Sequence, residues 1–69
     1  MQLYDIYREQ DKRKLLVAAY QERAAVIEFM SMVRDKVAAT DYAIEGDQFF
    51  IEFPDPTNGK NTRLFAQPI

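Results

Sequence analysis

The sequence predicts one small α+β domain, in which an antiparallel sheet of four or five strands has one amphipathic helix packed on one face. Three observations support this fold. Both glycines and all three prolines follow residue 45, so the first half of the chain lacks strong breakers. Residues 21–39 have helical periodicity, and residues 42–53 are typical of two strands around a tight turn. The predicted order is ββαββ-like, with residues 1–69 as a single domain.

The first twenty residues are predicted to form a β-hairpin. Leu3–Tyr7 and Leu15–Tyr20 are rich in β-forming residues and flank the polar stretch 9–14. The alternative is one long helix over residues 11–39 followed by a hairpin, since no glycine or proline interrupts that span. That helix would place the cations of residues 12–14 in its first turn, where the dipole disfavours each by roughly a few tenths of a kcal/mol. The hairpin is therefore preferred.

The segment from residue 21 to residue 39 is the predicted helix. Its large apolar residues recur at three- and four-residue spacing and form one face. This face is expected to cover the sheet and to build the core with the inward residues of the strands. The residues expected to be buried are Val26, Phe29, Val33, Ile44, Phe49 and Ile51.

A second hairpin follows the helix, with Gly46-Asp47 as its two-residue turn. Such a turn places Glu45 opposite Gln48 and continues the pairing outward, which puts alternate apolar residues on one side. Residues 54–61 contain Pro-Asp-Pro and Asn-Gly, both of which favour turns, so they are predicted to be a loop. Residues 62–66 then alternate and form a last strand.

Catalytic chemistry has little support in the composition. Histidine and cysteine, which most often act as general base, nucleophile or zinc ligand, are absent. Without histidine, no Ser-His-acid triad can form around Ser31, the only serine. The two glycines are isolated, and the acidic residues do not follow the ligand order of a Ca²⁺ loop. We therefore expect no enzyme activity and no catalytic, cofactor-binding or metal-binding site.

The composition also indicates a compartment. The chain is 48% hydrophobic, which is too apolar for a disordered segment, and it has no cysteine for the disulfides of a small secreted domain. No basic and apolar leader begins the sequence, and no apolar run approaches the roughly 20 residues that span a bilayer. We expect a cytoplasmic protein that does not bind membranes.

The second half of the chain holds the predicted binding surface. Residues 1–39 have a net charge of +1, whereas residues 40–69 have a net charge of −3. Phe50 and Phe65 have the strand parity opposite to the core, so they are expected to form an exposed patch. Acidic residues around it would steer a basic or nucleic-acid-binding protein partner, whereas a homodimer is the alternative use of the patch. The predicted partner-binding residues are Phe50, Phe65, Glu45, Glu52 and Asp55.

The alternative function is nucleic-acid binding through the basic segment 8–14, whose cations could pair with phosphates. Its candidate residues are Arg8, Lys12, Arg13 and Lys14. The preferred function is non-enzymatic binding of a macromolecule through protein–protein contacts. By analogy of size and charge alone, such a protein would suit an inhibitor from a phage or mobile element that blocks a host defence nuclease complex, of the anti-CRISPR type.

Overall fold

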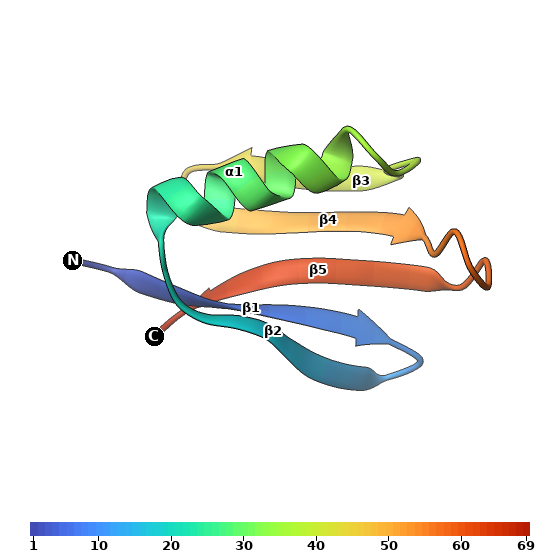
Figure 1. Ribbon diagram of the computed structural model, residues 1–69, viewed down its shortest axis with the longest axis horizontal. Helices are drawn as coiled ribbons and strands as arrows, with labels where there is room; N and C mark the ends of the chain where they lie inside the picture. The colour runs from blue at the N-terminus through green and yellow to red at the C-terminus, as the bar shows by residue number, and fades with distance from the viewer.

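The chain folds in the order ββαβββ, as seen in a computed structural model that describes residues 1–69 (Figure 1). The elements are β1 (Leu3–Gln10), β2 (Arg13–Glu22), α1 (Arg23–Arg34), β3 (Asp41–Glu45), β4 (Gln48–Pro54) and β5 (Asn61–Pro68). The five strands form one sheet in the order β2-β1-β5-β4-β3, and all neighbours are antiparallel. The α+β class with one helix and an antiparallel sheet is confirmed, whereas the ββαββ-like order is wrong because three strands follow the helix.

The first hairpin is present, with a shorter connection than predicted. The strands continue to Gln10 and resume at Arg13, because the pairing extends through the polar residues that the sequence suggested as a loop. Only Asp11 and Lys12 lie in the turn, with φ angles of 55° and 65°. Positive φ at both central residues is the signature of a type I′ turn, whose twist matches that of the strands. The alternative long helix over 11–39 is wrong because residues 13–22 are β2.

Strand β2 is irregular where it passes the first half of β1. Tyr4 pairs with Gln21 and Ile6 with Ala18, so β2 has one extra residue in this interval. A second extra residue, Val17, lies between the partners of Ile6 and Tyr7. Both irregularities are β-bulges, which bend a strand and increase its twist.

Helix α1 is shorter than the predicted 21–39. It begins at Arg23 directly after β2 and ends at Arg34, where the N–H of Asp35 still donates to the carbonyl of Ser31. Val37 and Ala39 lie beyond the helix and pack against the core while the chain approaches β3. Tertiary packing of these two side chains therefore replaces the last helical turns that periodicity predicted.

The core lies between α1 and the sheet face that it covers. Of the residues expected to be buried, Val26, Phe49 and Ile51 are buried, whereas Phe29 and Val33 are partly buried at its border, as is Ile44. Met30 has the spacing of the apolar face of the helix, but it was not among the residues expected to be buried, and it is fully buried. The buried apolar residues are Tyr4, Ile6, Val26, Met30, Phe49, Ile51, Phe53 and Leu64.

The second hairpin has the predicted register, with Glu45 opposite Gln48, Ile44 opposite Phe49 and Ala43 opposite Phe50. Gly46 has a φ of 64°, which suits the first central position of a type II′ turn. The loop between β4 and β5 also lies where the sequence placed it. The last strand is longer than predicted and lies between β4 and β1, so the two ends of the chain are neighbours at one end of the sheet (Figure 1).

Candidate functional site

An aromatic row crosses the sheet on the face opposite α1, which we call the open face. Phe50 of β4 is the cross-strand partner of Phe65 in β5, and Phe65 is the partner of Tyr7 in β1. Leu16 of β2 continues the row beyond Tyr7. Their strand neighbours point to the covered face, because successive side chains alternate between the two faces of a sheet. Phe50, Phe65 and Tyr7 are the aromatic row.

Cationic side chains lie over these rings. Tyr7 and Phe65 are stacked with centroids 5.6 Å apart. The guanidinium of Arg63 lies 4.8 Å from the Phe50 centroid and 5.6 Å from that of Phe65, and the ammonium of Lys14 lies 4.6 Å from the Tyr7 centroid. Each contact is worth about 0.5–1 kcal/mol at an exposed site. The rings are therefore only partly exposed, whereas the sequence predicted free exposure.

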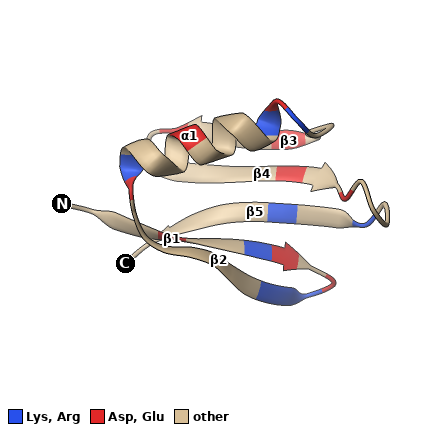
Figure 2. Cartoon of the chain, in the orientation of Figure 1, with Lys and Arg blue, Asp and Glu red and all other residues tan.

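A charged row runs beside the aromatic row and crosses all five strands. Its members are successive cross-strand partners, namely Asp41, Glu52, Arg63, Glu9 and Lys14. Figure 2 shows the charged segments of β4, β5, β1 and β2 side by side across the sheet. The closest contact in the row joins Arg63 Nε to Glu52 Oε1 at 4.0 Å. The row contains three carboxylates and two cations, so its net charge is negative.

The opposite flank of the aromatic row is also acidic. Glu45 lies at the end of β3 across from Gln48, and Asp5 lies across from Gln67. Close to this flank, a hollow of about 180 Å³ opens on the aromatic row. Its lining residues are Asp47, Gln48, Phe49, Phe50, Arg63, Phe65 and Ala66. The open face thus combines an aromatic centre, a hollow with polar and aromatic walls, and carboxylates on both sides.

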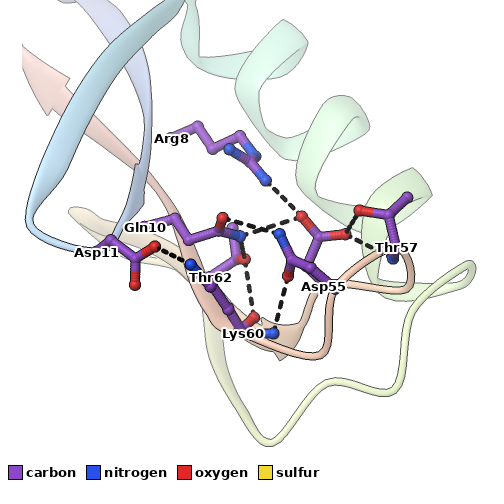
Figure 3. Close-up of polar contacts among 8 residues, drawn as sticks. Arg8, Gln10, Asp11, Asp55, Thr57, Lys60 and Thr62 are labelled. Carbon is purple, nitrogen blue, oxygen red and sulfur yellow. Dashed lines mark hydrogen bonds and ion pairs between the residues drawn. The ribbon is translucent and has the colours of Figure 1, made fainter.

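Asp55 does not join this face, although the sequence grouped it with Phe50 and Phe65. Its residue is only 9% exposed. Its carboxylate accepts hydrogen bonds from the Thr57 hydroxyl at 2.6 Å, the Thr57 N–H at 2.8 Å, Gln10 at 3.0 Å and the Arg8 guanidinium at 2.6 Å (Figure 3). Arg8 and Gln10 share the β1 face of buried Ile6, so Asp55 fixes the β4–β5 loop to β1 on the covered side.

These hydrogen bonds set the protonation of Asp55. The side-chain and backbone hydrogen bonds from Thr57, then the one from Gln10 and the charge of Arg8, lower the pKa of Asp55 to about 2 against the opposing effect of desolvation. Bonds to the charged form favour it, so the carboxylate stays ionised at any ordinary pH. Asp55 is therefore a structural anion rather than a steering charge.

The basic residues proposed for nucleic-acid binding do not form one stripe. Arg8 is paired with Asp55, and Arg13 occupies the same face of the hairpin as Arg8. Lys14 lies on the open face over Tyr7, and Lys12 lies in the turn. Two of the four cations thus lie on the covered face, one lies on the open face and one lies in the turn.

Two members of the open face were missed as site residues. Tyr7 and Arg63 became part of it because β5 lies between β1 and β4, a placement that no local pattern encodes. The alternation of Arg63 and Phe65 in one strand was the available signal, since it puts a cation and an aromatic ring on one face.

No group of three or more His, Cys, Asp or Glu residues is positioned to hold a metal ion. The one helix is too short to cross a membrane. No protein-family model matches the chain, and neither a curated protein nor a solved structure matches it.

Proposed function

We propose that this chain is a non-enzymatic binding module whose open face docks on a basic surface of a protein partner. The single observation that supports this most is the aromatic row with carboxylates on both sides. Aromatic residues are the commonest anchors of protein interfaces, whereas acidic residues are depleted at interface centres and serve at the border. The open face has both in these positions.

The rings of the open face are suited to a cationic anchor. Arg63 already stacks on Phe50 and Phe65, which demonstrates that a guanidinium fits over this pair. A partner arginine that takes the place of Arg63 in the hollow beside Asp47 would find an aromatic surface and a carboxylate together. Arg is the cation that most often combines stacking with hydrogen bonding to carboxylates.

A protein partner fits the charges better than a nucleic acid does. Phosphates would meet an acidic surplus on the open face, and the four basic candidates point to different faces. A basic partner surface, such as the nucleic-acid-binding face of another protein, has the complementary sign. Within this class we propose a nuclease of a host defence complex as the target, with the module acting as its inhibitor.

In-cell photo-crosslinking tests the proposal. A photo-reactive phenylalanine analogue is placed at position 50 on the open face, and in a matched control at position 32, which lies exposed on α1. We expect a discrete protein adduct at position 50 and not at position 32. The adduct should weaken when Glu52→Lys is added, because the substitution removes an attractive charge and adds a repulsive one.

Two outcomes contradict the proposal. An adduct that disappears on nuclease treatment would identify a nucleic acid as the partner. Equal adducts at positions 50 and 32, or none at position 50, would show that the open face is not the binding surface.

A further inference from the structure

The loop between β4 and β5 contains the dipeptide Asn58-Gly59. An asparagine before a glycine is chemically labile, because the backbone nitrogen of the second residue can attack the side-chain amide carbon and glycine has no side chain to hinder it. Both residues are exposed, so water and base reach them. The other asparagine of the chain, Asn61, precedes the β-branched Thr62 within β5, where the same attack is hindered.

We propose that Asn58 is a site of spontaneous deamidation and that opening of the β4–β5 loop controls its rate. A base from the solvent removes the proton of the Gly59 nitrogen, which bonds to Asn58 Cγ. The Cγ–Nδ2 bond of Asn58 then breaks, and the nitrogen leaves as ammonia. Water opens the resulting succinimide at one of its two carbonyls, which gives aspartate or isoaspartate at position 58. One water is consumed and one ammonia is released, with no oxidation or reduction.

The native hydrogen bonds of the loop oppose this reaction. The N–H of Gly59 donates to the Asp55 carbonyl at 2.7 Å, and the reaction removes this proton. The Nδ2 of Asn58, which is the leaving group, donates to Gln10 Oε1 at 3.2 Å. The N–H of Asp55 closes the loop further by donating to the Lys60 carbonyl at 2.8 Å. Ring closure therefore requires the loop to open locally, because both hydrogen bonds at the reacting atoms are lost.

The side chain of Gln10 is oriented for its contact with Asn58. Its Nε2 donates to Asp55 Oδ2 at 3.0 Å and to the Thr62 hydroxyl oxygen at 2.7 Å (Figure 3). The Thr62 hydroxyl in turn donates to the Lys60 carbonyl at 3.2 Å, so its oxygen acts as the acceptor for Gln10. These contacts leave Gln10 Oε1 facing Asn58 as an acceptor, which only a donor can satisfy.

Deamidation would release the loop from β1. The product carboxylate has no N–H, so an anionic oxygen would face Gln10 Oε1, and two acceptors repel each other. In isoaspartate the backbone also gains one methylene between residues 58 and 59, within the turn that the hydrogen bonds of Asp55 close. The reaction is therefore a covalent record of loop opening, and a modified molecule should open more readily than an unmodified one.

Peptide mapping by mass spectrometry measures the reaction in the purified full chain. Incubation in mildly alkaline buffer should convert Asn58, whereas Asn61 should react much more slowly. The rate at Asn58 should be about tenfold or more higher in guanidinium chloride, where two hydrogen bonds no longer hold the reacting atoms. In the same denaturant, Gly59→Ala should slow the reaction, because its methyl group hinders attack by the neighbouring nitrogen.

A pair of variants tests control by the loop without denaturant. Gln10→Ala removes the acceptor of Asn58 Nδ2 and should raise the rate by about threefold or more. Gln67→Ala, the same substitution at an exposed position near the other end of β5, should leave the rate unchanged. Circular dichroism at the incubation temperature verifies that both variants are folded.

Three outcomes would overturn the proposal. The first is no conversion of Asn58 in buffer or in denaturant. The second is an equal rate in both, which is measured on the wild-type chain and does not depend on any variant. The third is an equal rate in folded Gln10→Ala and folded Gln67→Ala, which would show that the hydrogen bond to Gln10 does not protect the site.

Discussion

The two faces of the sheet use the same strands in different ways. On the covered face, Ile51, Leu64 and Ile6 are nearly inaccessible to solvent and pack below α1. On the open face, the residues beside them, Phe50 and Phe65, remain partly exposed under the side chain of Arg63. The covered face is stabilised by removal of apolar surface from water, whereas the open face rests on weaker ring and cation contacts. Alternate residues of one strand thereby contribute to the core and to the face that we propose for binding.

The largest expected effect tests the covered face. Ile51→Ala removes a fully buried side chain from the central part of the core, so it should lower the free energy of unfolding by about 2–5 kcal/mol. That loss is comparable to the stability of so small a domain. Urea denaturation followed by circular dichroism measures it, and a loss below about 1 kcal/mol would place Ile51 outside the core.

A second variant tests the polar part of the covered face. Asp55→Asn removes the charge that Arg8 neutralises and one acceptor oxygen that Thr57 uses, so the melting temperature should fall. The effect should be smaller than that of Ile51→Ala, since the side chain keeps its volume. Thr57→Ala removes one of the same hydrogen bonds and is the matched comparison. Its melting temperature should lie between those of wild type and Asp55→Asn.

The lowered pKa of Asp55 predicts that the free energy of unfolding depends on pH in the acid range. Its folded pKa is about 2, below the ordinary value of 3.8, so the unfolded chain binds the proton more readily between these values. The contribution of Asp55 is therefore complete above about pH 4 and is lost as the pH falls through about 2. Urea melts across this range should show a shallower acid slope for Asp55→Asn than for wild type. Equal slopes would mean that Asp55 titrates alike in both states.

A smaller effect is expected on the open face. Phe50→Ala should cost about 1–2 kcal/mol, because the ring is partly exposed and loses less apolar contact than Ile51 does. The variant should still unfold cooperatively. It should also lose the crosslinked adduct formed through the open face. Because position 50 is substituted here, the photo-reactive analogue is placed at position 65 to measure that adduct. An unfolded Phe50→Ala would show that the open face also belongs to the core.

The smallest effect concerns the cation over the rings. Arg63→Gln removes two cation–π contacts that share one guanidinium and a long ion pair, so the expected loss in total is about 1 kcal/mol. High salt should reduce the difference, because the pair is exposed to solvent. A loss of unfolding free energy as large as that of Phe50→Ala would show that the contacts of Arg63 stabilise the open face as much as the Phe50 ring does.

Local patterns predicted some of these features and could not predict others. The register of the second hairpin followed from Gly46-Asp47 and the alternation around it. Asp55 was assigned to the open face because the sequence showed it only as a turn residue near Phe50. Its partners Arg8 and Gln10 lie 47 and 45 residues earlier in the chain, and only the pairing of β1 with β5 brings them close.

The position of β5 also affects how the chain folds while it is being synthesised. Residues 4 and 68 are cross-strand partners, so the inner edge of β1 stays unpaired until Asn61–Pro68 has left the ribosome. The β1–β2 and β3–β4 hairpins can form early from local contacts and α1 packs against both, yet one continuous sheet does not form without the last strand. Closing so long a loop is slow, and the emerging chain exposes two strand edges for that time. Removal of Asn61–Pro68 would therefore leave two hairpins under α1 without a continuous sheet between them.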